Sequence, residues 1–308
     1  MKIVFMGTPD FSVPTLEQLH KSEHNVLAVV TAPDRPAGRG LQLNISAVKK
    51  YALSINVPIL QPKNLKSPEF IGKLKELNAD LNIVVAFRML PELVWNLPRL
   101  GSINLHASLL PQYRGAAPIN WAIINQEKET GLTTFFIKQK IDTGNILLQE
   151  KCKIDMDETA GSLHDKLMIK GAALVIKTIN DITSNNYNTL TQEEAGDIKK
   201  APKIFKNDCQ ILWYRSAIEI DHFIRGLNPY PIAWTIMNNK TLRIYKGRIS
   251  DVSLNLKPGE LICKDKKLIV GTKDGIFEIL ILQLEGKKKI SSNEFINGLN
   301  LNKSIYLK

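Results

Sequence analysis

Two apolar runs, "LNIVVAF" at residues 81–87 and "SINLHAS" at residues 102–108, decide the fold of this 308-residue chain. A short, nearly continuous apolar run is typical of a strand buried on both faces of a parallel sheet. The first half of the chain alternates such runs with helical patterns. The expected strands lie at 2–7, 25–33, 57–60, 81–87 and 102–108, and the expected helices at 11–22, 46–56 and 67–78. This order predicts an α/β domain with a mostly parallel sheet and helices on both faces.

The pattern changes after this alternation. Two strands are expected at 131–139 and 145–154, joined by a short turn, and a long amphipathic helix follows at 162–182. The helix expected at 67–78 begins with Ser67 as a possible N-cap and Pro68 at its first position, which proline favours.

A polar stretch from Thr183 to about Lys203 has the composition of a linker. Beyond it we expect one helix at 216–227 and short strands separated by turns, a pattern that indicates a small β-barrel. These strands lie at 232–237, 241–249, 267–272 and 275–284. The resulting division is a first domain at 1–183, a linker at 184–205 and a second domain at 206–308.

Charge and cysteine content limit the possible functions. The net charge is +11, and residues 206–308 carry 17 Lys+Arg against 10 Asp+Glu. A basic C-terminal third suggests an anionic partner such as a nucleic acid, although compositional drift in an AT-rich genome would give a similar excess. The three separated cysteines favour neither a disulfide framework nor a metal site and fit a reducing cytoplasm. No apolar run reaches the roughly 18 residues of a membrane span.

The expected strand at 102–108 carries unusual polar side chains. Asn104, His106 and Ser108 alternate with apolar residues just before a loop, so they share one face near the carboxyl end of the strand. Ligands bind at that end in open α/β sheets, so we expect Asn104 and His106 to point into an open crevice. A core histidine bonded to a nearby backbone carbonyl is the alternative, and the sequence leaves both open.

A carboxylate could complete this site. Asp142 lies in "KIDTGNIL", where the pattern alone favours an Asx-turn. Its place in a hairpin near the end of the sheet could also bring it to His106, and a carboxylate that holds an imidazole protonated commonly helps it polarise carbonyls. The first strand is followed by "GTPDF" and not by G-x-G-x-x-G, the pattern of a dinucleotide-binding site. The sequence also contains neither the phosphate-binding pattern of a P-loop nor the zinc-protease pattern H-E-x-x-H.

At these residues the sequence resembles the folate-dependent formyltransferases. The resemblance rests on "NLHASLLPQYRGAAPINWAI" and "IDTGNIL", and also on "FMGTPDFSVPTLEQL", "TAPDRPAGRG", "LNPYPIAW", "GTKDGIFEIL" and "EGKKKIS". It implies a Rossmann-like catalytic domain and an OB-like C-terminal barrel. It also implies transfer of a formyl group from 10-formyltetrahydrofolate, without a metal, to the amino group of methionine esterified to initiator tRNA.

The resemblance assigns roles to individual residues. Asn104 and His106 would donate hydrogen bonds to the formyl oxygen, and Asp142 would hold His106 protonated and accept a proton through water. The residues implied for folate binding are Ser108, Leu109, Leu110, Pro111, Phe87, Arg88, Met89, Leu90 and Ile141. The loop "AFRMLP" departs from the family pattern, because Arg88 stands where a small residue is expected.

The implied partners are folate and initiator methionyl-tRNA, and we expect a cytoplasmic monomer that binds no membrane. The residues assigned to RNA contact are Arg35, Arg39, Lys203, Lys287, Lys288 and Lys289. Three alternatives remain: a formyltransferase acting on an amino sugar or a purine precursor, a hydrolase of formyl-folate, and a non-catalytic RNA-binding protein. The basic loop and barrel argue against a small substrate, and the intact Asn104, His106 and Asp142 argue against a non-catalytic protein.

Overall fold

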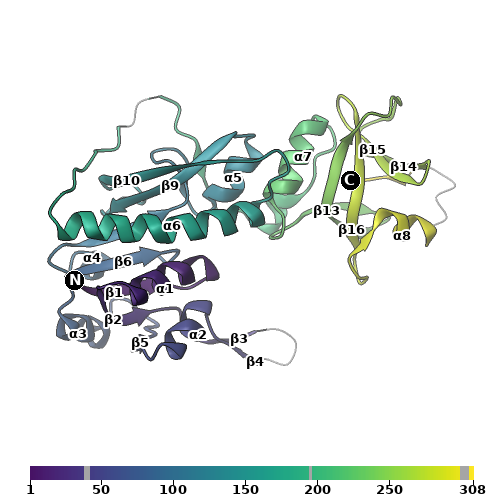
Figure 1. Ribbon diagram of the computed structural model, residues 1–308. Helices are drawn as coiled ribbons and strands as arrows, with labels where there is room; N and C mark the ends of the chain where they lie inside the picture. Colours follow the sequence, from purple (N-terminus) through teal and green to yellow (C-terminus); the bar gives the residue numbers. More distant parts are fainter. Residues whose placement is uncertain (38–41, 194–195, 299–304) are drawn as a thin grey trace. The chain divides into compact units, whose positions relative to one another are not determined.

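The computed structural model describes residues 1–37, 42–193, 196–298 and 305–308, which form two compact units (Figure 1). Unit 1 consists of Met1–Gly115, Thr130–Lys153 and His164–Lys200. Unit 2 consists of Ala116–Glu129, Ile154–Leu163 and Ala201–Lys308. Two internal stretches of the N-terminal half therefore belong to the same unit as the C-terminal residues.

The sheet of unit 1 has seven strands in the order β10-β9-β7-β6-β1-β2-β5. Strands β7, β6, β1, β2 and β5 are parallel, whereas β9 runs antiparallel to β7. The bounds are β1 (Lys2–Gly7), β2 (Asn25–Val30), β5 (Ile59–Leu60), β6 (Leu81–Val85), β7 (Ser102–His106), β9 (Glu129–Phe136) and β10 (Ile146–Lys153). The two runs at 81–87 and 102–108 are thus neighbouring central strands, as their apolar character predicts.

Helices cover both faces of this sheet. Alternate residues of its strands point to opposite sides, so both faces carry apolar side chains that a helix can bury. Val4, Met6 and Val84 pack with Phe70 and Leu74 of the helix α3 on one face. On the other face the long helix α6 brings Gly171 against Leu105, and its course along the sheet is visible in Figure 1. The helices of unit 1 are α1 (Val13–Lys21), α2 (Ala47–Ser54), α3 (Pro68–Leu77), α4 (Glu92–Trp95) and most of α6 (Ala160–Thr183), whereas α5 (Pro118–Ile124) belongs to unit 2.

Local sequence signals set the helix ends. The Ser67 hydroxyl accepts the backbone N–H of Phe70 at the start of α3, and Pro68 is its first residue, as predicted. The helix ends at Asn78, whose φ of 46° is in the left-handed region that asparagine tolerates. The remaining short elements are η1 (Asp10–Ser12), β3 (Arg35–Ala37), β4 (Gln42–Asn44), β8 (Arg114–Gly115), β11 (Lys200–Ala201) and η2 (Lys206–Cys209).

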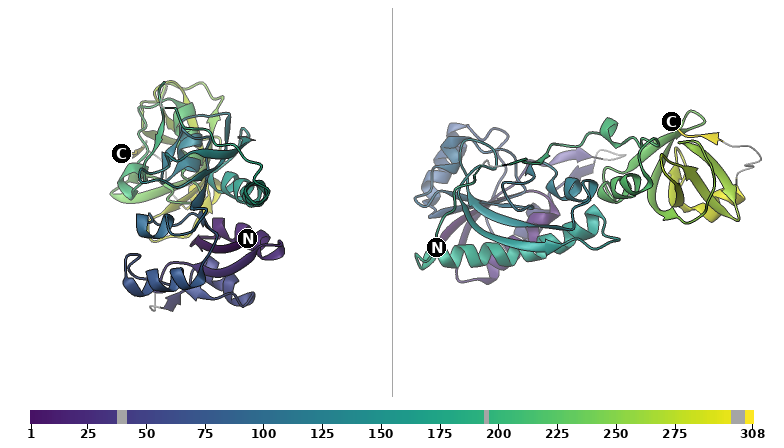
Figure 2. Two further views of the ribbon diagram at one scale, coloured as in Figure 1. Left: turned by 90° about the vertical axis from the view of Figure 1, so that its left-hand side faces the viewer. Right: turned by 90° about the horizontal axis from the view of Figure 1, so that it is seen from above.

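Unit 2 is built around an antiparallel, barrel-like sheet (Figure 2). Its strands follow the order β12-β13-β16-β15-β14-β18, with β17 beside β16. The final residues bring its ends together, because Ile305 and Tyr306 pair with β14 while Lys308 exchanges backbone hydrogen bonds with Ile236 of β12. The elements are α7 (Ala217–Gly226), β12 (Ala233–Met237), β13 (Lys240–Ser250), β14 (Glu260–Lys264), β15 (Lys267–Gly271), β16 (Ile276–Leu284), β17 (Ile290–Ser291), α8 (Ser292–Asn297) and β18 (Ile305–Tyr306). The residue patterns do not indicate β14, α8 or β18.

The fold class is confirmed: an α/β sheet covered on both faces and a smaller C-terminal barrel-like sheet. Residues 184–200, expected within a linker, are counted with unit 1. Within the described ranges, no helix has the length and apolar character to cross a membrane.

Candidate active site

Strand β7 presents two polar side chains on the face opposite α6. Asn104 is paired with Phe135 of β9, and His106 lies two residues further along the same face. The Asn104 side chain is half-buried, and its amide has no hydrogen-bond partner among the described residues. Because buried polar groups are normally bonded, an amide left open in this position is available to a ligand.

His106 is held between two acceptors. Its Nε2 lies 2.9 Å from the backbone carbonyl oxygen of Tyr113, which can only accept, so Nε2 carries a proton and donates. Its Nδ1 lies 3.7 Å from Oδ2 of Asp142. An imidazolium would therefore face an acceptor at each nitrogen. The side chain is only 7% exposed, so the expectation that His106 points into an open crevice is wrong: neighbouring loops cover the strand end.

The structure explains why each position of the "DTG" turn, residues 142–144, carries its residue type. Asp142 has a φ of 53°, in the left-handed region, and its Oδ2 accepts the backbone N–H of Gly115 at 3.0 Å. The Thr143 hydroxyl donates to the Lys140 carbonyl at 3.0 Å. At Gly144 a Cβ would lie 1.5 Å from the carbonyl oxygen of Phe136, so only glycine fits. The turn thus places the Asp142 carboxylate between Gly115 and the histidine.

The connection between β9 and β10 brings Asp142 to this position from the amino end of β7. Because β9 is antiparallel to β7, its last residue, Phe136, pairs with Ile103 rather than with His106. The connection at residues 137–145 must fold back along β7 for its carboxylate to reach the imidazole ring. The expectation that the turn could bring Asp142 to His106 is confirmed, since Oδ2 of Asp142 lies 3.7 Å from Nδ1 of His106.

The segment Ser108–Pro111 is held in place by contacts within unit 1. Ser108 is fully buried, and its hydroxyl donates to the Gln112 carbonyl at 2.6 Å. Leu110 is packed in a small cluster with Phe135 and Ile146. Leu109 and Pro111 are half-buried, so they are the members of this segment that still have surface to offer a ligand.

The loop "AFRMLP" follows β6. Phe87 and Leu90 pack against the core of unit 1. The Arg88 guanidinium donates to the backbone carbonyls of Lys63, at 3.0 Å, and Pro62. The unexpected arginine therefore ties this loop to the segment after β5. Met89 is 75% exposed, and Ile141 of the later turn is 61% exposed.

The residues assigned to RNA contact fall in both units. In unit 1, Arg35 is exposed at the start of β3, whereas Arg39 lies outside the described residues. The adjacent Asp34 accepts hydrogen bonds from Lys49 and Gln61, and these bonds lower the pKa of its carboxyl group. The base of the β3–β4 hairpin is therefore anchored to α2 and the segment after β5.

In unit 2, the assigned lysines are exposed and two of them lie over aromatic rings. The Nζ of Lys203 is 5.2 Å from the ring centroid of Phe205, and that of Lys289 is 4.2 Å from the ring centroid of Tyr245. Such cation–π contacts hold a lysine against the surface while its charge stays accessible. Lys287 and Lys288 are also exposed.

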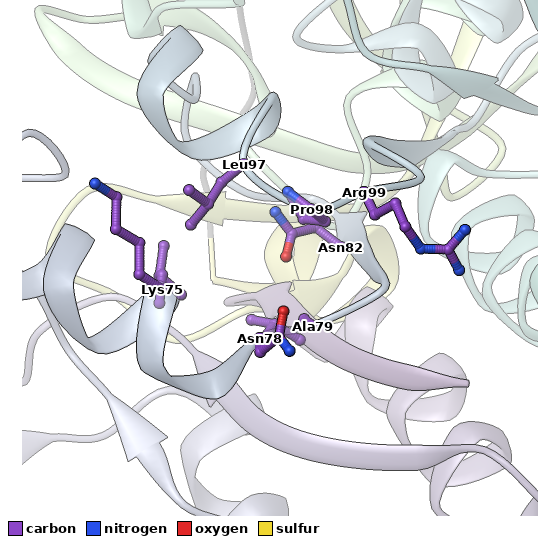
Figure 3. A pocket seen from close by; sticks show the side chains of 9 residues that line it. Lys75, Asn78, Ala79, Asn82, Leu97, Pro98 and Arg99 are labelled. Carbon is purple, nitrogen blue, oxygen red and sulfur yellow. The ribbon is translucent and has the colours of Figure 1, made fainter.

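A cavity of about 310 Å³ lies elsewhere in unit 1 (Figure 3). Its lining comes from α3 and from the residues that precede β6 and β7, and thus from the amino ends of these strands. The lining residues are Val4, Leu74, Lys75, Asn78, Ala79, Asn82, Leu97, Pro98 and Arg99. None of them belongs to the Asn104, His106 and Asp142 group, so this cavity is separate from the candidate active site.

Two residues that support this group are not indicated by any sequence pattern. Tyr113 supplies its carbonyl to His106 from a backbone φ of 59°, and a left-handed tyrosine leaves no trace in a residue pattern. Gln192 bonds to the Asp142 turn from the supposed linker, where one more polar residue does not stand out.

The formyl transferase family matches residues 1–179, and the formyl transferase C-terminal domain matches residues 203–300. A methionyl-tRNA formyltransferase of Flavobacterium johnsoniae is 49% identical over 303 residues, covering 97% of this chain and 96% of its own. One from Bacteroides fragilis is 47% identical over 317 residues, covering 100% and 98%.

A solved structure shares the fold. WlaRD, a sugar 3N-formyl transferase solved in the presence of dTDP and 5-N-formyl-THF, has a TM-score of 0.67 and 22% identity, covering 94% of this chain and 99% of its own. The family matches span both units, and the relatives match along nearly the whole length. The chain belongs to the formyl transferase family, and to the methionyl-tRNA formyltransferases within it.

Proposed function

We propose that this protein transfers the formyl group of 10-formyltetrahydrofolate to the free amino group of methionyl-initiator tRNA, giving N-formylmethionyl-tRNA for translation initiation. The observation that carries the proposal is the Asn104, His106 and Asp142 group in a chain that matches methionyl-tRNA formyltransferases over 97% of its length. The catalytic part corresponds to residues 1–183, the linker to 184–205 and the tRNA-binding part to 206–308.

Asn104 stabilises the charge that develops during the reaction. An unprotonated amine attacks the formyl carbon, and negative charge grows on the formyl oxygen. The bond between that carbon and N10 of the folate then breaks, and tetrahydrofolate leaves with a proton on this nitrogen. A preorganised N–H donor aimed at that oxygen lowers the barrier. The Asn104 amide is the group best prepared for this, because it is half-buried and has no partner among the described residues.

His106 and Asp142 act together. The imidazole N–H that now bonds the Tyr113 carbonyl can be exchanged for a bond to the formyl oxygen, since catalytic hydrogen bonds often tighten only with substrate present. Asp142 faces the other ring nitrogen and orients the ring. Its carboxylate can also take the proton that the attacking amine loses, through a water molecule.

The folate supplies the activated formyl group, and the residues around the site fit such a ligand. The unpartnered Asn104 amide provides a donor, and Leu109 and Pro111 keep surface available. Met89 and Ile141 expose apolar side chains that would otherwise remain in water, which suits a flat, partly apolar pterin. The loop after β6 and the segment Ser108–Pro111 would be held in shape by their buried or hydrogen-bonded residues. These are Phe87, Arg88, Leu90, Ser108 and Leu110.

The tRNA is bound through its phosphates. The residues proposed for these contacts are Arg35, which is exposed at the start of β3, Arg39, which lies outside the described residues, and the exposed Lys203, Lys287, Lys288 and Lys289 of unit 2. Contacts of this type position an RNA without reading its sequence. We further propose that the protein is a cytoplasmic monomer.

The test is transfer of labelled formyl from 10-formyltetrahydrofolate to charged and to uncharged initiator tRNA. Label should appear on charged tRNA alone. Label on a free amino sugar or a purine precursor, with none on charged tRNA, would favour the small-amine formyltransferase. Release of labelled formate without transfer would favour the hydrolase.

A further inference from the structure

The polar segment, here residues 187–192, is bound to unit 1 rather than free. Leu190 exchanges two backbone hydrogen bonds with Ile146, of 2.8 and 2.9 Å. The Tyr187 ring lies against Phe136, with 6.2 Å between the ring centroids. These contacts bring the segment beside the Asp142 turn, and Gln192 follows two residues after Leu190.

Gln192 is buried and uses all the hydrogen-bonding groups of its amide within this corner. Its Nε2 donates to the carbonyl oxygens of Asp142, at 2.9 Å, and Gly144, at 2.8 Å. Its Oε1 accepts from Nε of Arg114 at 3.0 Å and from Nη2 at 2.8 Å. The side chain is 8% exposed. One amide therefore joins the turn that carries the carboxylate to the residue next to Gly115, which binds the same carboxylate.

We propose that Gln192 is a positioning residue for formyl transfer and acts through Asp142. Its amide joins the Asp142 turn to the Arg114–Gly115 strand, so that the carboxylate faces His106. This rests on the function proposed above. Gln192 itself touches no reacting atom.

The backbone of the turn explains why such support is needed. Asp142 has a left-handed φ, a conformation that costs energy unless the surroundings fix it. Gly144 lies so close to Phe136 that the turn has no room to shift inward. Without Gln192 the buried Gly144 carbonyl and the part-buried Asp142 carbonyl would lose this donor, so its removal should release the turn rather than merely open a cavity.

The same stretch of chain supports the other partner of His106. The backbone N–H of Tyr113 donates to the Lys199 carbonyl at 2.7 Å, while the Tyr113 carbonyl accepts from His106. The Gln112 amide accepts from the Lys199 N–H at 2.9 Å. Both acceptors that face the imidazole are thus fixed by residues 192–199, a range of which the structure describes all but residues 194–195.

The experiment is a double-mutant cycle on the full chain. Gln192→Met keeps the volume and removes all four hydrogen bonds, and Asp142→Asn removes the charge that Gln192 is proposed to position. Gln192→Met alone should lower kcat by about 10- to 100-fold, the usual cost of losing an orienting partner, with KM for charged tRNA within about twofold. In the Asp142→Asn background the same change should lower kcat by less than about threefold, because the effects of coupled residues do not add.

Two further variants keep the result interpretable. Gln192→Glu has nearly the same shape and still accepts from Arg114, but it cannot donate to the two carbonyls, so it should lose at least as much kcat as Gln192→Met. It decides the question if the methionine variant does not fold. Thr191→Ala changes an exposed neighbour in the same segment and should leave kcat and KM unchanged.

Equal losses of kcat in the two backgrounds would overturn the inference, because Gln192 would then act independently of Asp142. A Gln192→Glu enzyme with parental kcat would do the same. If the parent enzyme forms no formylmethionyl-tRNA, the proposed function fails instead, and the cycle is then run on formate release from 10-formyltetrahydrofolate. Non-additive losses in that reaction would still support the positioning role.

Discussion

Polar side chains lie near both ends of strand β7, and the two groups differ in how completely they are hydrogen-bonded. At the amino end, Asn82 of β6 donates to the Val94 carbonyl and to the Ser102 hydroxyl, and Ser102 donates to the Trp95 carbonyl. All these side-chain donors are used. At the carboxyl end, Asn104 has no partner among the described residues, whereas His106 donates to the Tyr113 carbonyl and has its other ring nitrogen 3.7 Å from a carboxylate. The 310 Å³ cavity lies at the amino end (Figure 3).

The difference shows which property marks a reactive site. Polar groups that satisfy one another stabilise the fold and have nothing left for a ligand. Groups held close together but incompletely bonded can exchange partners when a substrate enters. An available donor beside a paired acid and base therefore marks the candidate active site.

The largest expected effect is at Asp142. Asp142→Asn keeps the shape of the side chain but removes the charge that faces His106. We expect kcat for formyl transfer to fall by about 10²- to 10⁴-fold, the range for a positioned acid–base group. Steady-state kinetics with charged tRNA measures it. Unchanged kcat with a lower melting temperature would mean that Asp142 is only a turn residue.

Asn104→Ala and His106→Ala come next and separate catalysis from stability. Each should lower kcat by about 10²- to 10³-fold, as the loss of one oxyanion donor does. Asn104→Ala should leave the free energy of unfolding nearly unchanged, because its amide has no partner to lose. His106→Ala should also cost about 1–3 kcal/mol, because the buried Tyr113 carbonyl loses its donor. Urea unfolding beside kinetics tests both, and a fully active Asn104→Ala would refute the assignment.

The lysines of unit 2 should affect affinity and not rate. Changing Lys287, Lys288 and Lys289 together to Ala should raise KM for tRNA and leave kcat nearly unchanged, as loss of uniform binding does. The slope of log affinity against log salt should become shallower by about 0.7–0.9 for each phosphate that a lysine no longer neutralises. Binding measured at several salt concentrations checks this. Salt-insensitive binding in the parent would mean that the basic surface is composition only.

The smallest effect on activity is expected at the amino end of β7. Asn82→Ala removes two buried donors and should lower the free energy of unfolding by about 1–3 kcal/mol, while kcat stays within about twofold of the parent. Unfolding and kinetics on the same preparation test the comparison directly. A large loss of kcat without a loss of stability would place part of the active site near the cavity.

Much of the fold could be predicted because its signals are local. Each of these signals determines structure only within a few residues along the chain. Examples are the apolar runs of β6 and β7, the capping serine of α3, and the alternation of Asn104 and His106. The missed elements are β14, α8 and β18, and β18 has only two residues, whose pairing with β14 joins positions more than 40 apart. No local pattern reports such a pairing.

The sequence by itself determined the α/β class, the barrel-like C-terminal sheet, and the residue types of the candidate site. Tertiary structure alone decided that Asp142 folds back along an antiparallel strand to reach His106, that His106 is buried rather than open, and that Gln192 holds the turn. The physical reason is one of range. Propensity and periodicity act over one or two turns of chain, whereas these contacts join residues 36 and 50 positions apart and exist only once the sheet has brought them together.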